Sequence, residues 1–336
     1  MSRRHTGPTI AEIAAAAGVS PGTVSKALNG RGQLRAQTRA TIQRAADELG
    51  FRPAPYRRLA PDLRSYTVAV LTDDSFGRFS MPVMLGAESA LGAGQISVML
   101  CDDRGDPIRE RHYLDMLHRR RVDGLIVTSR RTEARETLAG ATSFPVVYTL
   151  TSSTDPDDVS VIADEEQGAR EATTHLITTG RRSIAYVSGP QRHRSARLRA
   201  DGVTNALRST GAGGPVAGLW GEWSEFWGRQ AAVILRDSHP DVNGVVCGND
   251  QIARGLCDGL RDLGVRVPYD VAVIGFDNWD VIAMASRPPL TSVDLRLDEI
   301  GRVAATELLA KVEGRGSRGL IRVPTRLVLR ESTGLG

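Results

Sequence analysis

Short apolar runs of strand length alternate with amphipathic helical patterns through most of this chain, and that alternation restricts its fold more than any other feature. The first series of apolar runs covers residues 67–71, 96–100, 124–128 and 145–149, with helical patterns at 81–92 and 107–120. The second series covers 184–187, 244–247 and 271–275, with helical patterns at 166–179, 196–209, 225–237 and 250–263. Continuous apolar strands joined by helices are typical of parallel sheets buried on both faces. The sequence therefore predicts an α/β body made of two doubly wound parallel-sheet lobes.

A weak internal repeat supports two similar lobes. RRRVDGLIVTS at 119–129 is similar to HPDVNGVVCGN at 239–249. Two doubly wound lobes leave a cleft between them that is lined by the carboxyl ends of their strands, and ligands bind there by default. We therefore expect a small-molecule site in the cleft between the lobes.

A dinucleotide-dependent enzyme is the obvious alternative for such a body, and it would need a glycine-rich phosphate turn. The glycine cluster GAGGPVAG at 211–218 follows a helical pattern rather than a strand and contains Pro215. It therefore lacks the strand–turn–helix context of a dinucleotide fingerprint. The sequence shows no P-loop, no GxSxG motif and no paired histidine ligands, and its six histidines are scattered. No enzyme activity, catalytic residue, metal or cofactor is predicted.

Positive charge is concentrated near the N-terminus. Residues 1–64 contain 11 Lys or Arg against four Asp or Glu, a net charge of +7, whereas the other 272 residues carry a net charge of −3. A basic segment on a near-neutral body suggests a polyanionic partner, for which nucleic acid is the first choice. On charge alone, a basic tail that only aids solubility is the alternative.

The basic segment has the pattern of a helix-turn-helix. Thr9 precedes a helical run with Glu12 three residues on, which is the spacing of a capping box. Ser20 can cap a second helix that begins at Pro21, where the missing amide hydrogen has no cost. A third helix is expected at 36–49, with the inward residues Ile42, Ala45, Ala46 and Leu49. Two short helices joined by a tight glycine turn predict a DNA-binding domain over 1–52, with a generic three-helix bundle as the alternative.

The stretch GVSPGTVSKALNG, followed by a basic helix that ends in ELGFRP, resembles the N-terminal signature of the LacI/GalR family of bacterial transcriptional regulators. By that resemblance Pro21, Gly22 and Lys26 face base edges. The residues that hold phosphates or fix the helices are then Ser20, Thr23, Ser25 and Asn29, together with the cap Thr9. Lys26 can donate to guanine or to a phosphate, whereas Pro21 offers only apolar contact. Residues at this end of the second helix are therefore expected to make few specific contacts with bases.

Residues 53–65 are expected to connect the DNA-binding domain to the body. In the family this segment forms a hinge helix in the DNA-bound dimer and places a leucine in the minor groove. Leu59 is the nearest match, but it stands one residue closer to Pro53 than the family spacing implies. Pro55 and Pro61 bracket the helix, and a proline inside a helix costs ~3 kcal/mol. The sequence of residues 53–65 is compatible with either a hinge helix or a plain linker.

Residues 66–330 resemble the effector domain of the same family and the related periplasmic sugar-binding proteins. The sequence SARLR at 195–199 places Arg199 at the family's effector-binding arginine, and Asn249 and Asp277 each follow a predicted strand. A guanidinium, an amide and a carboxylate together suit a neutral molecule rich in vicinal hydroxyls. Each residue also has a structural alternative as a solvated charge, a turn residue or a helix cap.

Other effector contacts are expected from aromatic and loop residues. Trp223 matches a position where some family members place an aromatic ring under the ligand, and Phe276 precedes Asp277. Ser75 and Phe79 lie in the loop after the first strand. An aromatic ring suits the C–H face of a sugar. Thr149 stands where several sugar-responsive members have an acid, so the sequence leaves the sugar undefined.

The resemblance also implies the organisation of the body over 66–336. Its crossover strand and dimer-side helix match residues 288–305. The first lobe is then expected over about 66–160 and the second over about 161–290, with a return to the first lobe after about 290.

These features predict a sequence-specific DNA-binding transcriptional regulator, a repressor, whose affinity for a pseudo-palindromic double-stranded DNA operator is set by a sugar-like effector. One helix-turn-helix makes too few contacts for tight specific binding, so a homodimer is expected, with a tetramer also open. The alternatives are a regulator without a diffusible effector and a solute-binding protein.

A cytoplasmic location without membrane contact is expected. The longest apolar runs are strand-sized, well short of the ~20 residues that span a bilayer. The N-terminal sequence MSRRHTGPTI lacks the apolar region of an export signal. Three cysteines without metal-ligand spacing fit buried thiols in a reducing compartment.

Overall fold

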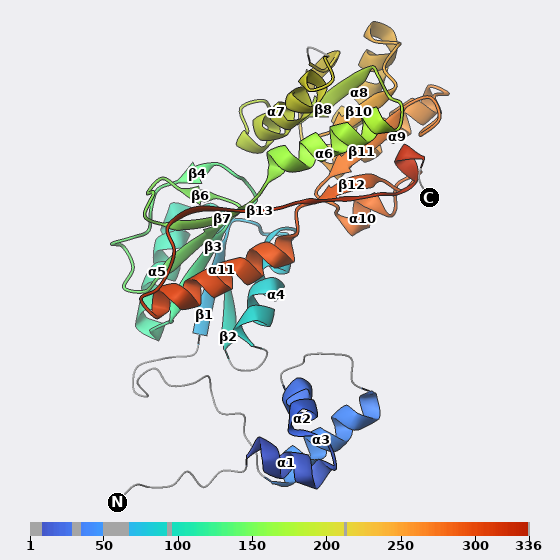
Figure 1. Ribbon diagram of the computed structural model, residues 1–336. Helices are drawn as coiled ribbons and strands as arrows, with labels where there is room; N and C mark the ends of the chain where they lie inside the picture. Colours follow the sequence, from blue (N-terminus) through green and yellow to red (C-terminus); the bar gives the residue numbers. More distant parts are fainter. Residues whose placement is uncertain (1–8, 29–34, 50–66, 93–95, 212–213, 335–336) are drawn as a thin grey trace, which may run out of the picture.

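The computed structural model describes residues 9–28, 35–49, 67–92, 96–211 and 214–334 (Figure 1). Asn29, Leu59 and the expected hinge at 53–65 lie outside the described residues, as does the side chain of Ser25.

Three helices form the N-terminal domain: α1 (Ile10–Ala17), α2 (Pro21–Leu28) and α3 (Ala36–Glu48). The capping box is present, because Thr9 N donates to Glu12 Oε2 at 2.6 Å and Glu12 N donates to Thr9 Oγ1 at 3.3 Å. The buried core of the domain consists of Ile13, Ala14, Val24, Ile42, Ala45 and Ala46. The helix-turn-helix prediction is confirmed. The inward prediction for Leu49 is wrong, because α3 ends at Glu48 and Leu49 is 41% exposed.

The first lobe is built on a six-stranded parallel sheet. Its strand order is β13-β7-β5-β3-β1-β2. The strands are β1 (Thr67–Thr72), β2 (Ser97–Asp102), β3 (Gly124–Thr128), β5 (Val146–Thr149), β7 (Val159–Ala163) and β13 (Gly319–Val323). The helices of this lobe are α4 (Ser80–Leu91), α5 (Pro107–Arg120) and α11 (Leu297–Val312). A two-stranded sheet of β4 (Ala134–Arg135) and β6 (Ser152–Ser153) lies at its edge.

The second lobe repeats this plan with the strand order β14-β12-β11-β10-β8-β9. Its strands are β8 (Ile184–Ser188), β9 (Ala217–Trp220), β10 (Gly244–Cys247), β11 (Ala272–Phe276), β12 (Thr291–Asp294) and β14 (Arg326–Val328). Its helices are α6 (Glu165–Thr178), α7 (Arg194–Arg208), α8 (Glu225–Ser238), α9 (Asp250–Asp262), α10 (Asp280–Ala283) and the 3-10 turn η1 (Glu331–Thr333). The edge strand β14 pairs antiparallel with β12, whereas the other pairings of the sheet are parallel. The expected class of two doubly wound lobes is confirmed.

The chain passes between the lobes at three places in its described part. β7 of the first sheet leads into α6 of the second lobe, and β12 of the second sheet leads into α11 of the first. β13 then leads back to β14, so β14 and η1 pack on the second lobe (Figure 1). β7 runs to Ala163 and β12 runs to Asp294.

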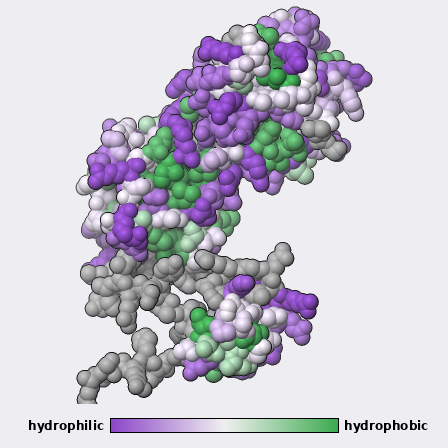
Figure 2. All heavy atoms as spheres, viewed as in Figure 1, coloured by the Kyte–Doolittle hydropathy of each residue, from purple (hydrophilic) through white to green (hydrophobic). Residues whose placement is uncertain are grey.

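Helices α4 and α11 pack closely on one face of the first sheet. A Cβ atom added at Gly86 on α4 would lie 1.9 Å from the carbonyl oxygen of Asp298, and one at Gly301 on α11 would lie 2.0 Å from that of Val83. These two glycines therefore allow the helix backbones to touch. The space-filling view shows apolar side chains reaching the surface of both lobes (Figure 2).

Candidate functional site

The carboxyl ends of strands from both sheets meet at the boundary between the lobes, and Asp277 occupies a strained position there. Asp277 directly follows β11 and has a φ of 92°, and Asn278 has a φ of 49°. Residues other than glycine rarely adopt positive φ, and such strain clusters at functional sites. The amide of Asn278 donates to Ser292 Oγ at 3.0 Å, so β12 holds this turn in place. The turn directs the carboxylate of Asp277 toward two arginines.

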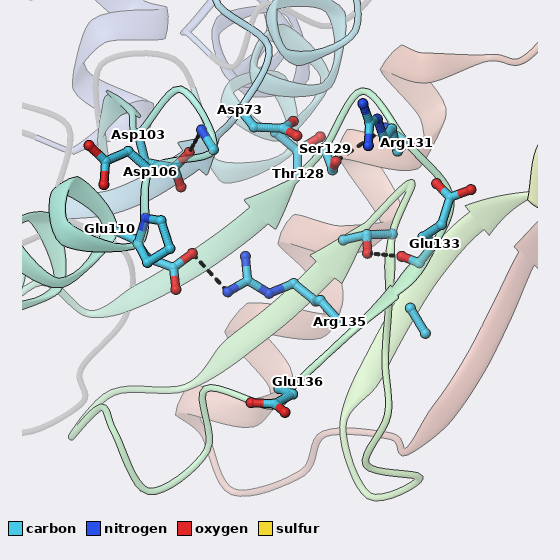
Figure 3. A pocket seen from close by; sticks show the side chains of 14 residues that line it. Asp73, Asp103, Asp106, Glu110, Thr128, Ser129, Arg131, Glu133, Arg135 and Glu136 are labelled. Carbon is cyan, nitrogen blue, oxygen red and sulfur yellow. Dashed lines mark hydrogen bonds and ion pairs between the residues drawn. The ribbon is translucent and has the colours of Figure 1, made fainter. Parts of the chain in front are cut away.

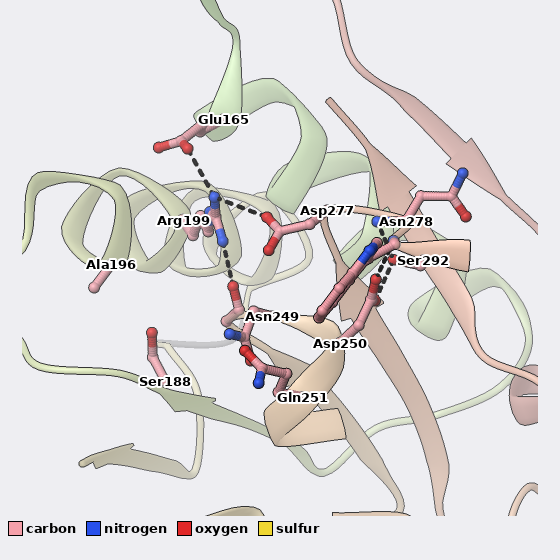
Figure 4. Close-up of polar contacts among 12 residues, drawn as sticks. Glu165, Ser188, Ala196, Arg199, Asn249, Asp250, Gln251, Asp277, Asn278 and Ser292 are labelled. Carbon is pink, nitrogen blue, oxygen red and sulfur yellow. Dashed lines mark hydrogen bonds and ion pairs between the residues drawn. The ribbon is translucent and has the colours of Figure 1, made fainter. Parts of the chain in front are cut away.

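Arg199 is the first of these arginines and lies buried on α7 (Figure 4). Its guanidinium donates to Glu165 Oε1 at 2.7 Å and to the carbonyl of Gly248, and it lies 3.4 Å from Asp277 Oδ1. The ring of Phe276 lies 4.0 Å from the same guanidinium. Burial disfavours the charged form, but the carboxylates of Glu165 and Asp277 outweigh it and raise the pKa of Arg199. The predicted pair of Arg199 and Asp277 is thus brought together.

Arg78 is the second arginine, and the sequence did not single it out. It comes from the first lobe, in the loop between β1 and α4, and its Nη2 atom lies 2.5 Å from Asp277 Oδ2. Its Nη1 atom donates to Gln251 Oε1 at 3.2 Å. The guanidinium also lies 4.4 Å from the ring of Trp279 and 4.9 Å from that of Phe79. Arg78 therefore joins the two lobes at the predicted effector residues.

Asn249 and its neighbour Asp250 begin α9. Asn249 is 4% exposed, and its Oδ1 atom accepts from the amide of Ile252 at 2.8 Å, so it caps the helix. Asp250 is fully buried, accepting from Ser292 Oγ at 2.5 Å and from the amide of Trp279 at 2.6 Å. Burial, with the charge of Asp277 nearby, raises the pKa of Asp250 to about 7. Asn249 thus has the cap role that was its structural alternative.

Trp223 forms part of the wall beside Arg199. Its Nε1 atom donates to His193 Nδ1 at 2.8 Å, and the two rings stack with centroids 6.1 Å apart. The Arg199 guanidinium lies 6.0 Å from the centroid of its ring. Burial lowers the pKa of His193, which favours the neutral ring that accepts this bond. The structure therefore places Trp223 with the predicted effector residues.

The other predicted effector residues differ in their surroundings. Phe276 is fully buried and packs against Arg199, and Phe79 lies against Arg78. Ser75 is exposed, and its hydroxyl donates to Asp102 Oδ1 at 3.4 Å, so it lies at the edge of the first sheet away from this network.

A pocket of about 340 Å³ opens at the carboxyl edge of the first sheet (Figure 3). Its lining includes the acidic residues Asp73, Asp103, Asp106, Glu110, Glu133 and Glu136 and the basic residues Arg131 and Arg135. Burial, with Glu110 and Asp73 nearby, raises the pKa of Asp103 to about 6. Glu133 accepts from the amide of Arg194 at 2.9 Å, which ties this edge to the start of α7 in the second lobe.

The sequence missed Arg78, Glu165 and Asp250. Arg78 lies between Ser75 and Phe79, both of which were selected, and Asp250 directly follows Asn249. Arg78 and Asp250 both lie just after a predicted strand, and this position could have identified them as candidate site residues. Glu165 follows β7, a strand that was not predicted, so no signal pointed to it.

Three of the predicted DNA-binding residues lie on the exposed face of the second helix of the helix-turn-helix. Pro21, Gly22 and Lys26 on α2 are exposed. Ser20 Oγ accepts from the amide of Thr23 at 3.2 Å and lies 2.8 Å from its hydroxyl, so Ser20 caps α2. The arrangement leaves Lys26 free to reach a base edge or a phosphate.

Among the residues that the structure describes, no group of three or more His, Cys, Asp or Glu side chains is placed to hold a metal ion. No helix among these residues has the length and apolar character needed to cross a membrane.

Fold and site together define a class: a two-lobed, periplasmic-binding-protein-like module that follows a helix-turn-helix domain. Residues 173–333 match the family model of the periplasmic binding protein-like domain, and residues 9–54 match that of bacterial regulatory proteins of the lacI family. The chain is 33% identical to the HTH-type transcriptional regulator CelR of Thermobifida fusca, over 99% of this chain and 100% of CelR. It belongs to the LacI family and is a DNA-binding transcriptional regulator.

Solved structures support the same assignment. The transcriptional regulator CelR–cellobiose complex has a TM-score of 0.67 and 31% identity, with 97% of this chain and 99% of that chain covered. The lac repressor dimer bound to operator and the anti-inducer ONPF has a TM-score of 0.66 and 25% identity, with 98% and 99% covered. The similarity thus extends over both the DNA-binding domain and the body.

Proposed function

We propose that this regulator is a repressor whose operator affinity is set by a neutral, hydroxyl-rich molecule, a sugar, bound between the lobes. The observation that carries the proposal is the meeting of Arg199, Asp277 and Arg78 at the lobe boundary. Such a site offers both donors and acceptors to hydroxyl groups. Asn249 adds an amide to this site, and Trp223 adds an aromatic wall. If they do not contact the ligand, Asn249 serves only as a helix cap and Trp223 only as a packing residue.

The relatives support a sugar. The structure of CelR, which is similar along nearly the whole chain, contains cellobiose. The two arginines at the lobe boundary are balanced by Asp277 and Glu165, so a ligand without charge fits the site. The effector acts through different affinities for two lobe arrangements, a coupling of about 1–3 kcal/mol in typical cases.

In the proposed arrangement residues 1–52 bind DNA, 53–65 connect and 66–336 hold the effector. Lys26, Pro21 and Gly22 face the bases of a half-site, and Ser20, Thr23, Ser25, Asn29 and the cap Thr9 fix or support the contact. Leu59 enters the minor groove if 53–65 forms a hinge helix. The protein then acts in the cytoplasm, where bacterial DNA lies.

A homodimer places two such domains on one pseudo-palindromic operator. Exposed apolar residues of both lobes are available for the dimer contact: Met81, Leu85 and Leu100 in the first lobe, and Val281 and Met284 in the second. The lac repressor, which is similar over the full length, is a dimer on its operator.

The sugar proposal is tested first with cellobiose, followed by ribose, glucose and maltose, on the full chain. A bound sugar raises the melting temperature, by the equivalent of about 2.7 kcal/mol at 100 times its Kd, and is recovered unchanged. Recovery of a converted sugar would favour an enzyme instead. A melting temperature that no sugar moves contradicts the proposal and favours a regulator without a sugar effector.

The DNA contact is tested with Lys26→Ala. Operators are first obtained by sequencing genomic fragments that co-purify with the protein. Lys26→Ala should weaken operator binding by about 1–3 kcal/mol, measured by fluorescence anisotropy. The matched control is Lys311→Ala on α11 of the body, which should leave operator affinity unchanged. Equal binding by Lys26→Ala and wild type would make Lys26 a solvated charge.

A further inference from the structure

Arg78 occupies the carboxylate that the effector is proposed to use. Its side chain is 14% exposed and that of Asp277 is 6% exposed, so their contact is largely shielded from water. Asp277 Oδ2 is bonded to Arg78, whereas Oδ1 has no hydrogen-bond partner and lies 3.4 Å from Arg199. Oδ1 is buried with its hydrogen-bonding capacity unused, and a hydroxyl can replace the bond to Oδ2 only when Arg78 gives it up.

We infer that Arg78 is a specificity-determining residue that acts as an internal occupant of the effector site and holds the two lobes together until a ligand displaces it. The inference rests on the proposed function for the identity of that ligand. The contact joins residues 199 positions apart in the sequence, one from each lobe. Gln251 and Trp279, which also contact this guanidinium, belong to the second lobe as well. Apart from the ring of Phe79, the contacts described for the Arg78 guanidinium are therefore with the opposite lobe.

The contact also selects the chemistry of the ligand. A guanidinium left buried without an acceptor is strongly unfavourable, so a ligand that takes Asp277 must offer Arg78 a replacement acceptor. Vicinal hydroxyls do both, because each hydroxyl donates and accepts. A cationic ligand on Asp277 would offer Arg78 no acceptor and would leave its charge without a carboxylate, whereas Arg199 would keep Glu165. The geometry therefore selects an uncharged polyol over an amino sugar.

The displacement of Arg78 is connected mechanically to α4. Asp74 Oδ2 accepts from the amide of Phe79 at 2.7 Å and from that of Ser80 at 3.0 Å, so the loop is fixed to the first turn of the helix. Helix α4 packs on α11 through Gly86. A movement of the loop backbone that carries Arg78 would therefore be passed to α4, on which the side chains of Met81 and Leu85 are exposed.

The test uses Arg78→Ala in the full chain, followed by amide hydrogen exchange without any sugar. Exchange should rise about tenfold or more in the second lobe, at the amides around Gln251 and at 277–279, because their cross-lobe cover is lost. Methylguanidinium chloride, which restores the missing group, should reverse the rise, and sodium chloride at equal ionic strength should not. The matched control is Arg104→Ala, an exposed arginine of the first lobe that should change neither segment.

The outcomes separate the inference from the proposed function. Exchange that changes only at 74–83 of the first lobe, or rises throughout both lobes without rescue by methylguanidinium, makes Arg78 a local structural residue and overturns the inference. Arg78→Lys keeps the positive charge but loses the planar guanidinium and its several donors. It should raise amide exchange less than Arg78→Ala does. If the full chain binds cellobiose, Arg78→Ala should bind it about three- to tenfold more tightly, and weaker binding would contradict competition. If no sugar binds, the proposed function is contradicted but the role of Arg78 in joining the lobes is not, because the hydrogen-exchange experiment is done without sugar.

Discussion

The carboxyl edges of the two sheets are built in different ways. In the second lobe, Arg199 and Asp250 are 5% and 0% exposed, and each is surrounded by partners from its own lobe. In the first lobe, the corresponding edge is an open pocket with six acidic residues, and Ser75 is exposed. The first lobe contributes to the network of the second mainly through Arg78, which reaches across the boundary.

This difference indicates a division of roles. Hydrogen bonds and ion pairs strengthen in a low-dielectric interior, and Arg199 and Asp250 are both held in this way, although Asp277 Oδ1 in the same network has no hydrogen-bond partner. The second lobe is therefore the preformed half of the site. The first lobe, with its open pocket and a long side chain extended across the boundary, is the half that can adjust.

Asp277→Asn should give the largest effect, because it removes the shared partner of Arg78 and Arg199. Arg199 keeps Glu165, but Arg78 loses its carboxylate, and breaking a buried ion pair by removing one partner costs about 3–5 kcal/mol in the free energy of unfolding. The response of operator binding to the effector should disappear, while operator affinity without effector stays within a few-fold of wild type. The measurements are urea unfolding and anisotropy with operator DNA.

Asp280→Asn is the control for Asp277→Asn, since Asp280 lies three residues on and its side chain is 80% exposed. It should change neither stability nor response. Loss of operator and effector binding together in Asp277→Asn would show that the second-lobe network is structural and would remove the distinction between the lobes.

The pH dependence of stability should reveal Asp250 of the second lobe. Its pKa is raised from 3.8 to about 7, so between these values the folded chain keeps a proton that the unfolded chain has lost. The stability from this group is therefore present at low pH and declines as pH rises through this window, by on the order of 3 kcal/mol. Asp250→Asn should remove the decline. Urea unfolding followed by tryptophan fluorescence at pH 5 to 8 measures it, because Trp220, Trp223, Trp227 and Trp279 all belong to the second lobe.

Asp103 should show the same sign in the first lobe with a smaller size. Its pKa is raised from 3.8 to about 6, so its contribution declines between these values and is constant above them. Because the pocket is open, we expect a decline of roughly 1 kcal/mol, removed by Asp103→Asn. Far-UV circular dichroism during urea unfolding follows the loss of secondary structure in both lobes and so gives the free energy of unfolding at each pH. A decline as large as that of Asp250 would mean that the first edge is as enclosed as the second.

Glu133→Gln should give the smallest effect. Glu133 accepts from the amide of Arg194 at the start of α7, and glutamine keeps an acceptor oxygen there but loses the charge. A negative charge at a helix N-terminus contributes about 0.3–1 kcal/mol, so the melting temperature should fall only slightly. Glu136→Gln, in the same pocket, is the control. A large loss of stability would place this edge among the rigid parts of the molecule.

Local signals allowed the helix-turn-helix to be predicted nearly residue by residue. Thr9 and Glu12 specify a capping box within four residues, and Ser20 caps the next helix in the same way. The buried strands β3, β8 and β11 were equally visible, because both of their faces are apolar. The edge strands β13 and β14 were missed, because their partly exposed residues give no continuous apolar run.

The sequence alone determined most helices, seven of the buried or partly buried strands, the class of the fold, the DNA-binding domain and the candidates Arg199, Asn249 and Asp277. These depend on contacts within a few residues or on the burial of whole runs, which composition and spacing record. Only the tertiary structure decided that Arg78 pairs with Asp277 and that Glu165 holds Arg199. The first pair is separated by 199 residues and forms because the strand ends of the two lobes face each other, whereas the second is separated by 34 residues and forms because α6 and α7 pack together in the second lobe. No local pattern encodes either pair, since each depends on how distant elements pack against each other.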